Sequence, residues 1–140
     1  MNVVADDEPF PTSDLRRYVD EGRAWVATDD DGEAPVGYLL LDIVDGNGHI
    51  EQVSVDPSHA RRGVGRSLIE RAAEWAAEEG FAALTLTAFS EVPWNAPYYE
   101  VLGFRRLSEQ EIAPGLRKIR TQETLHGLDA WPRVCMSRDL

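Results

Sequence analysis

The sequence predicts a mixed α/β domain, in which one mixed, mostly antiparallel β-sheet carries helices on both of its faces. Two features carry this prediction. The N-terminal half contains three strand-like apolar runs separated by turn residues, and a long helical pattern, a strand, a short helix and further strand-like runs follow it. The chain has 140 residues without a repeat, linker or low-complexity segment, which predicts a single domain over residues 1–140.

Each predicted element rests on a local pattern. The run Val36 to Val44 is nearly continuously apolar, which is typical of a central strand covered on both faces. Asp45-Gly46-Asn47-Gly48 predicts a tight hairpin. Apolar residues at helical spacing follow Gly63, and Gly80 stands where such a helix would end. The predicted strands are 24–27, 36–44, 49–55, 81–89, 103–107 and 131–138, and the predicted helices are 13–22, 63–79, 95–102 and 114–126.

The composition limits the kind of partner that the domain can bind. With 14 Lys and Arg against 25 Asp and Glu, the formal net charge of −11 disfavours nucleic acid and anionic membranes. No apolar run approaches the roughly 20 residues of a membrane span. The single cysteine, Cys135, and three unclustered histidines predict neither a disulfide nor a metal site. We expect a cytoplasmic protein, whose acidic surface fits either a halophilic source or a GC-rich genome with ordinary solvated turns.

The segment most informative about function is the predicted start of the long helix. A strand leads through a short turn into Arg61-Arg62-Gly63-Val64-Gly65-Arg66. Free N–H groups at a helix N-terminus, close-approach glycines and arginines together predict an anion site. The segment lacks the Lys-Ser/Thr of a nucleoside-triphosphate loop and the third glycine of a dinucleotide loop. Taken alone, these residues equally fit an irregular helix start with solvated arginines.

Two motifs in this order resemble the GNAT acetyltransferase superfamily. Ala60 to Gly65 resembles motif A, Arg/Gln-x-x-Gly-x-Gly/Ala, with Ala60 at the position usually held by Arg or Gln. Asn95 to Phe104 resembles motif B, which ends in Tyr-x-x-x-Gly-Phe. An unrelated phosphate-binding domain would leave this second match unexplained. The family's first strand is short or missing at this N-terminus.

The resemblance implies a sheet of about six to seven strands and a site for acetyl-coenzyme A, without a metal. The cofactor would lie between two splayed parallel strands, 52–55 and 84–89, with the Val53 N–H polarising the thioester carbonyl. The cofactor-binding residues that the resemblance implies are Val53, Ser54, Val55, Arg61, Arg62, Gly63, Val64, Gly65, Arg66, Ser67 and Asn95.

The resemblance also implies the chemistry, which is transfer of an acetyl group to a primary amine by direct attack in a ternary complex. Strict alternation would place His49, Glu51, Val53 and Val55 on one face of their strand. Glu51 is the expected base, with His49 or a water as alternatives, and Tyr99 is the expected proton donor to the departing thiolate. Tyr98, in contrast, is expected to pack beside Phe104.

Several alternatives stay open at this point. The same fold could serve as a non-catalytic acyl-coenzyme A sensor or interaction module. The acceptor could be a small-molecule or a peptide amine, and Trp94 with residues 117–126 could line its pocket. A homodimer is expected because members of the family commonly dimerise and because an open sheet edge could pair with another subunit.

Overall fold

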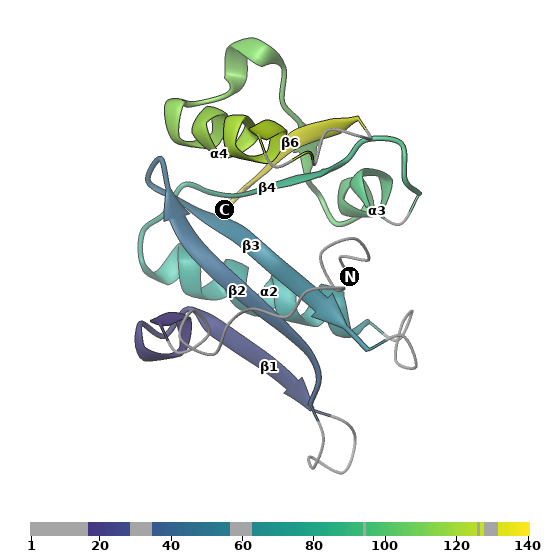
Figure 1. Ribbon diagram of the computed structural model, residues 1–140. Helices are drawn as coiled ribbons and strands as arrows, with labels where there is room; N and C mark the ends of the chain where they lie inside the picture. Colours follow the sequence, from purple (N-terminus) through teal and green to yellow (C-terminus); the bar gives the residue numbers. More distant parts are fainter. Residues whose placement is uncertain (1–16, 29–34, 57–62, 94, 126, 128–131) are drawn as a thin grey trace.

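The computed structural model describes residues 17–28, 35–56, 63–93, 95–125, 127 and 132–140, and its core is a six-stranded sheet (Figure 1). The strand order is β1-β2-β3-β4-β6-β5. All pairs are antiparallel except β3–β4, so the predicted mixed, mostly antiparallel sheet is confirmed. The strands are β1 (Ala24–Thr28), β2 (Pro35–Val44), β3 (Asn47–Val55), β4 (Ala83–Phe89), β5 (Arg105–Arg106) and β6 (Arg133–Asp139).

The helices also agree with the predicted ones. They are α2 (Val64–Glu78), α3 (Ala96–Val101) and α4 (Pro114–Leu125), and a helical turn occupies residues 17–20. A 3₁₀ turn, η3 (Glu109–Glu111), was not expected from the pattern, and its capping box with Ser108 explains it. The predicted start of the first helix lies outside the described residues. Among the described residues, none of the helices combines the length and the apolar composition that crossing a bilayer requires.

Helices cover both faces of the sheet, as the sequence predicted. Helix α2 directs an apolar stripe into the main core, where its residues Leu68, Ile69 and Ala72 are almost fully buried. Tyr99 from α3 belongs to the same core. Helix α4 lies on the opposite face, because its Glu123 bonds Thr87 of β4, a strand whose neighbouring side chains Leu86 and Ala88 point into the main core.

The β2–β3 hairpin holds the start of α4. Asp45 and Gly46 both have positive φ, 57° and 75°, as in a type I′ turn, and the predicted tight hairpin is present. The Asp45 carboxylate accepts hydrogen bonds from the N–H groups of Gly115 at 2.7 Å and Leu116 at 3.0 Å. These are N–H groups of the first turn of α4, which lack partners within the helix, so the hairpin caps it from a distant part of the chain.

The parallel strands β3 and β4 pair only where they begin. Gly48 lies opposite Leu84 and His49 opposite Thr85, and beyond these two pairs the strands have no further register contact along their described lengths. Figure 1 shows them diverging toward the end that holds the start of α2 and α3. The predicted splay is therefore present, and it begins at Leu86 rather than at Leu84.

A bulge in β3 changes which side chains share a face. Leu40 pairs with Gln52 but Leu41 pairs with Ile50, so Glu51 is an extra residue without a partner in β2. The expectation that Glu51 and Val53 share a face by strict alternation is wrong for this reason. Val53 packs in the core under α2, whereas the groups that act on Glu51 include Asp42 of β2 and Glu123 of α4, on the opposite side of the sheet.

Candidate active site

Beyond its two pairs with β4, strand β3 directs backbone N–H donors toward β4 without pairing to it, which we call the opening between β3 and β4. Asp56 N–H bonds Val36 O in β2 at 2.7 Å. Alternate N–H groups along a strand point to opposite sides, so those of Val53 and Val55 point toward β4. The backbone of Ser54 points toward β2, where Ser54 pairs with Tyr38. Of the three predicted backbone contacts on this strand, the geometry favours Val53 and Val55.

The N-terminus of α2 lies next to this opening. A Cβ atom at Gly37 of β2 would come within 2.9 Å of Ser54 O and 3.1 Å of Val64 Cγ1, so the helix start packs tightly against β2 and β3. Gly63 precedes the helix at φ 80°, a conformation that strongly favours glycine. Glycine is therefore the residue that makes this turn at the lowest conformational cost.

The first turn of α2 offers donors to an anion. The first bond within the helix runs from Ser67 N–H to Gly63 O at 2.9 Å, so the N–H groups of Val64, Gly65 and Arg66 precede it. No side chain among the described residues caps this end, and its first turn contains no acidic residue. The 15-residue helix thus directs its positive dipole end toward the opening. Arg61 and Arg62 lie outside the described residues.

Arg66 relates the start of α2 to helix α3 electrostatically. Its side chain is exposed on α2, and its charge acts on the phenol of Tyr98 in α3. Burial is the larger influence on Tyr98 and raises the pKa of its phenol, while Arg66 lowers it. The start of α2 and helix α3 therefore face each other across the opening.

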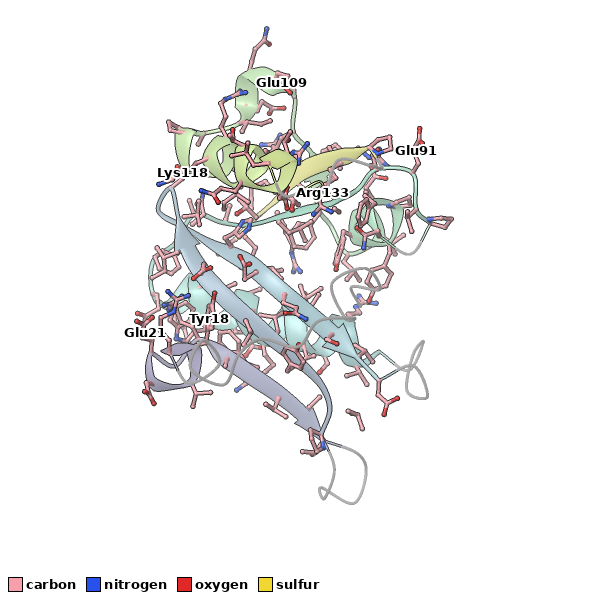
Figure 2. The ribbon with its side chains drawn as sticks, viewed as in Figure 1. Tyr18, Glu21, Glu91, Glu109, Lys118 and Arg133 are labelled. Carbon is pink, nitrogen blue, oxygen red and sulfur yellow. The ribbon has the colours of Figure 1, made fainter. Side chains whose placement is uncertain are left out.

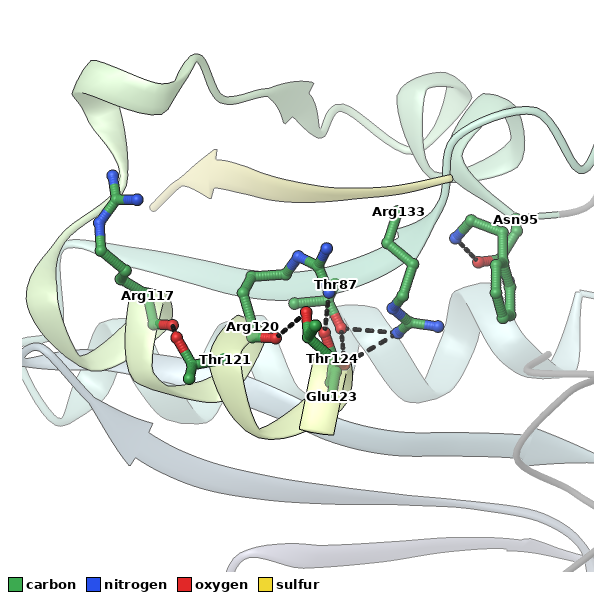
Figure 3. Close-up of polar contacts among 9 residues, drawn as sticks. Thr87, Asn95, Arg117, Arg120, Thr121, Glu123, Thr124 and Arg133 are labelled. Carbon is green, nitrogen blue, oxygen red and sulfur yellow. Dashed lines mark hydrogen bonds and ion pairs between the residues drawn. The ribbon is translucent and has the colours of Figure 1, made fainter. Parts of the chain in front are cut away.

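Asn95 holds the end of β4 rather than capping α3. It is buried, and its Oδ1 accepts a hydrogen bond from Phe89 N–H at 2.6 Å, visible beside the Asn95 label in Figure 3. The next N–H group, that of Ser90, bonds Pro132 O beside β6, so Phe89 N–H points the other way, toward the opening. Asn95 therefore lies on the β4 side of the opening with its oxygen already engaged, and its role in binding the cofactor stays a prediction.

Glu51 is the most perturbed carboxyl among the described residues. Its side chain reaches solvent, yet desolvation by the surrounding protein raises its pKa to about 7. The charge of Asp42 and a hydrogen bond to Asp42 act in the same direction, as does Glu123, and among the described residues Arg17 opposes them. A carboxyl with a pKa near 7 suits general base catalysis near neutral pH.

His49 lies on the same side of the sheet at the point where β3 and β4 part. Its side chain is buried, and its Nδ1 lies 2.9 Å from Thr85 Oγ1. Burial lowers the pKa of His49 to about 4, against the pull of Asp42, Glu123 and Asp45. At neutral pH the imidazole is therefore uncharged.

The two tyrosines of α3 have different surroundings. Tyr99 is 3% exposed, and its ring centroid lies 5.9 Å from that of Phe104. Tyr98 is half-buried and contacts the Tyr99 ring at 5.5 Å. The expectation that Tyr98 packs beside Phe104 is thus wrong, because α3 turns the Tyr99 ring, not the Tyr98 ring, onto Phe104. The role of Tyr99 as proton donor stays a prediction.

Sequence reasoning missed a group of charged side chains between α4 and β6. Glu123 Oε2 accepts from Thr87 Oγ1 at 2.7 Å and from Arg133 at 3.0 Å, while Arg120 donates to Oε1 at 2.9 Å (Figure 3). Arg133 also donates to Thr87 at 2.8 Å and lies 4.5 Å over the Phe89 ring. Glu123 and Arg133 lie ten residues apart and Thr87 lies 36 residues before Glu123, and no motif connects the three.

Sequence reasoning also missed Asp42, which lies in an apolar run and carries no motif. Its Oδ2 accepts from the Tyr18 hydroxyl at 2.9 Å, and its Oδ1 lies 3.4 Å from Arg23 Nη1. Figure 2 shows Tyr18 beside the lower half of the sheet and Arg133 in the upper half, so the two polar groups belong to different halves.

The described residues do not form a metal centre. They contain no group of three or more His, Cys, Asp or Glu side chains that could hold a metal ion. Cys135 is buried in β6, and burial raises the pKa of its thiol to about 11, as expected of a small core residue. The two remaining predictions, for Trp94 and His126, lie outside the described residues.

Comparison with known proteins identifies the fold family. Residues 3–104 match the Acetyltransferase (GNAT) family. The chain belongs to this family. The match covers both motifs recognised in the sequence and extends beyond them toward the N-terminus.

The GNAT domain also has curated relatives. It is 36% identical over 82 residues to the uncharacterized N-acetyltransferase YjcF of Bacillus subtilis, covering 59% of this chain and 56% of that protein. It is 29% identical over 98 residues to the peptidyl-lysine N-acetyltransferase YjaB of Escherichia coli, covering 70% of this chain and 60% of that protein. The matches thus span little more than half the length of these relatives.

Solved structures share the GNAT fold. A putative streptothricin acetyltransferase from Bacillus anthracis, in complex with acetyl coenzyme A, aligns with a TM-score of 0.71 at 18% identity, covering 96% of this chain and 70% of that one. An acetyltransferase of the GNAT family from Staphylococcus aureus aligns with a TM-score of 0.71 at 17% identity, covering 96% and 78%. At these identities the likeness concerns the fold.

Proposed function

We propose that this GNAT domain is an acetyl-coenzyme A-dependent N-acetyltransferase that acts on a primary amine. The observation that carries the proposal is the opening between β3 and β4. There the N–H groups of Val53 and Val55 point away from β2, the uncapped first turn of α2 packs against β2 and β3, and Glu51 lies two residues from Val53 on the same strand. An elongated thioester with a pyrophosphate fits such a row of donors. The acetyl coenzyme A in the Bacillus anthracis structure is consistent with this proposal.

Each group in the proposed site has a role in the transfer. The cosubstrate supplies an activated acetyl group as a thioester. The N–H of Val53 polarises the thioester carbonyl. One such preorganised donor can raise the reaction rate by about 10²–10³. Glu51 takes the proton from the attacking amine, while a C–N bond forms and the C–S bond breaks. Tyr99 gives its proton to the departing thiolate and regains one from solvent.

A neutral amine is the reactive species, which makes the pKa of Glu51 relevant. An alkyl amine with a pKa near 10 is almost fully protonated at pH 7. A carboxylate whose pKa is about 7 accepts a proton from it far more readily than an ordinary glutamate does. The expected rate therefore rises as the pH increases through about 7.

Isothermal titration with acetyl-coenzyme A at low and at molar potassium chloride tests binding, with circular dichroism in both buffers. Binding at one site is expected, and a folded protein that fails to bind in either buffer would contradict the proposal. Order that appears only in molar salt would support the halophilic interpretation of the −11 charge.

Thiol release then tests catalysis with small amines and a lysine peptide, the latter because one relative is a peptidyl-lysine N-acetyltransferase. Tyr99→Phe should bind acetyl-coenzyme A normally and release thiol more slowly. Binding without transfer to any amine would instead favour the sensor alternative. The amine acceptor, the cytoplasmic location and the homodimer stay predictions.

A further inference from the structure

Asp42 of β2 is the most heavily contacted carboxylate on the first three strands. The Tyr18 hydroxyl donates to its Oδ2 at 2.9 Å. Arg23, which is 8% exposed, lies 3.4 Å from Oδ1, and Arg17 lies 3.8 Å from the same oxygen. The proposed function assigns no role to this group. Its donors point at Asp42 and therefore stabilise a negative charge at this position.

The bulge brings Glu51 next to this carboxylate. Asp42 pairs directly with His49, and Glu51 lies two residues further along β3, which makes it the diagonal neighbour of Asp42. After desolvation, the charge of Asp42 and hydrogen bonding to it raise the pKa of Glu51, so the two carboxyl groups lie within reach of each other. Because an ionised carboxylate can only accept, such a bond requires a proton on one of the two groups. The Tyr18 and Arg23 donors are bonded to Asp42, so the proton resides on Glu51.

The other charged groups around Asp42 and Glu51 also favour a proton on Glu51. Of the cations in the part of the chain that the structure describes, Arg17 lowers the pKa of Glu51, while Glu123 from α4 raises it. His49 faces Asp42, Asp45 and Glu123, and its buried imidazole is neutral near pH 7. The Glu51 charge in turn helps to raise the pKa of Tyr18, although burial and Asp42 are larger causes. The charges of the described residues around Glu51 are therefore mostly negative.

We propose that Asp42 is a positioning residue, which orients the Glu51 carboxyl through a shared proton and makes Glu51 a stronger base. This inference rests on the proposed role of Glu51 in the transfer reaction. When Glu51 loses its proton, two negative charges face each other, and accepting a proton from the amine removes that repulsion. A lone glutamate at this position would lack both the orientation and the driving force.

The test is the substitution Asp42→Asn, with the Glu51 side-chain carboxyl followed by ¹³C NMR titration and assigned with Glu51→Gln. An asparagine removes the like charge and offers an N–H donor to Glu51. We expect the Glu51 midpoint to fall by about one pH unit, and the acidic limb of the kcat/KM profile to fall with it. A Glu51 midpoint that stays at the wild-type value would overturn the proposal.

A second variant keeps the proposal testable should Asp42→Asn not fold. Tyr18→Phe removes one donor from Asp42, which leaves that carboxylate a better partner for the shared proton. The Glu51 midpoint should therefore rise, and an unchanged or lower midpoint would contradict the proposal. Glu74→Gln is the matched control, because it removes a carboxylate from the exposed Arg71–Glu74 ion pair on α2 and should leave both readouts unchanged.

The NMR titration also separates this inference from the proposed function. If Glu51 is not the base, Glu51→Gln will retain the wild-type rate and its pH profile, while the carboxyl titration still reports whether Asp42 controls Glu51. If the protein transfers no acetyl group at all, the titration remains measurable. Failure of the coupling and failure of the enzyme assignment therefore give different results.

Discussion

The two halves of the splayed sheet each contain a carboxylate among charged side chains, but the two groups are balanced differently. On the β4–β6 half, Glu123 accepts from Thr87, Arg133 and Arg120, so donors surround its charge. On the β1–β3 half, the donors bond Asp42, and Glu51 is left beside another carboxyl. The first arrangement satisfies a charge and stabilises the fold. The second leaves a charge to be compensated by a proton, which suits catalysis.

This difference shows why acid content alone does not identify a functional carboxylate. Both glutamates come from an acidic chain, and neither is part of a recognisable motif by itself. What separates them is where the nearest donors point. A satisfied glutamate has its donors on its own oxygens, whereas an activated one has them on its neighbour.

The largest expected effect concerns the β1–β3 half. Glu51→Gln should lower kcat by about 10²–10⁴, because a general base is lost, and should remove the acidic limb near pH 7. The measurement is a pH profile of thiol release, with acetyl-coenzyme A affinity as the control. If Glu51→Gln keeps wild-type turnover across this pH range, Glu51 is not the base, and the proposed difference between Glu51 and Glu123 is contradicted.

The next effect concerns the β4–β6 half and should appear in stability. Glu123→Ala leaves Arg133, 10% exposed in its side chain, without its carboxylate partner. Breaking such a pair should lower the free energy of unfolding by about 3 kcal/mol. Urea denaturation gives this value directly, and Glu100→Ala, on the exposed pair with Arg106, serves as the control. A loss no larger than that of the control would show that the Glu123 cluster is not structural.

A smaller effect sharpens the role of the opening between the halves. Gly63 and Gly80 have nearly the same positive φ, 80° and 85°, at the start and just beyond the end of α2. Alanine at either position should cost about 1 kcal/mol in stability. Only Gly63→Ala should also weaken acetyl-coenzyme A binding in isothermal titration. Equal affinity of the two variants would separate this helix start from the proposed cosubstrate site.

The smallest effect is a change in the pH dependence of stability. The pKa of Glu51 is raised to about 7 in the folded protein, above its ordinary value of 4.5. Its contribution to stability is therefore complete below pH 4.5 and is lost as the pH rises through about 7. Wild type should lose more stability than Glu51→Gln between pH 5 and pH 8 in parallel urea titrations. The same loss in both proteins would contradict the raised pKa.

The sequence predicted the elements well because their signals are local. The apolar run of β2, the Asp45-Gly46 turn and the glycines flanking α2 each determine backbone geometry within a few residues. The motifs also indicated the region where β3 and β4 part, with Val53 on β3, Gly63 before α2 and Asn95 before α3. The bulge at Glu51 escaped prediction, because it results from the register against β2 and not from a property of the β3 sequence.

Long-range polar contacts were equally inaccessible to the sequence. Asp42 lies in an apolar strand, and its donors come from residues 17–23, with Tyr18 contributed by a separate helical turn. Arg133 meets Glu123 only because α4 packs across β4 and β6. Neither pairing has a fixed spacing along the chain, so neither could have been found without the fold.

The capping of α4 by Asp45 has a consequence for how the protein can be observed. Amide protons in the first turn of a helix normally exchange with deuterium within the fastest phase of an experiment, because nothing holds them. Those of Gly115 and Leu116 are held by a carboxylate from the opposite half of the sheet. Their exchange rates therefore measure how often the hydrogen bonds between Asp45 of the hairpin and the start of α4 break. The exchange rates of these two amides therefore report how often the two halves of the sheet separate.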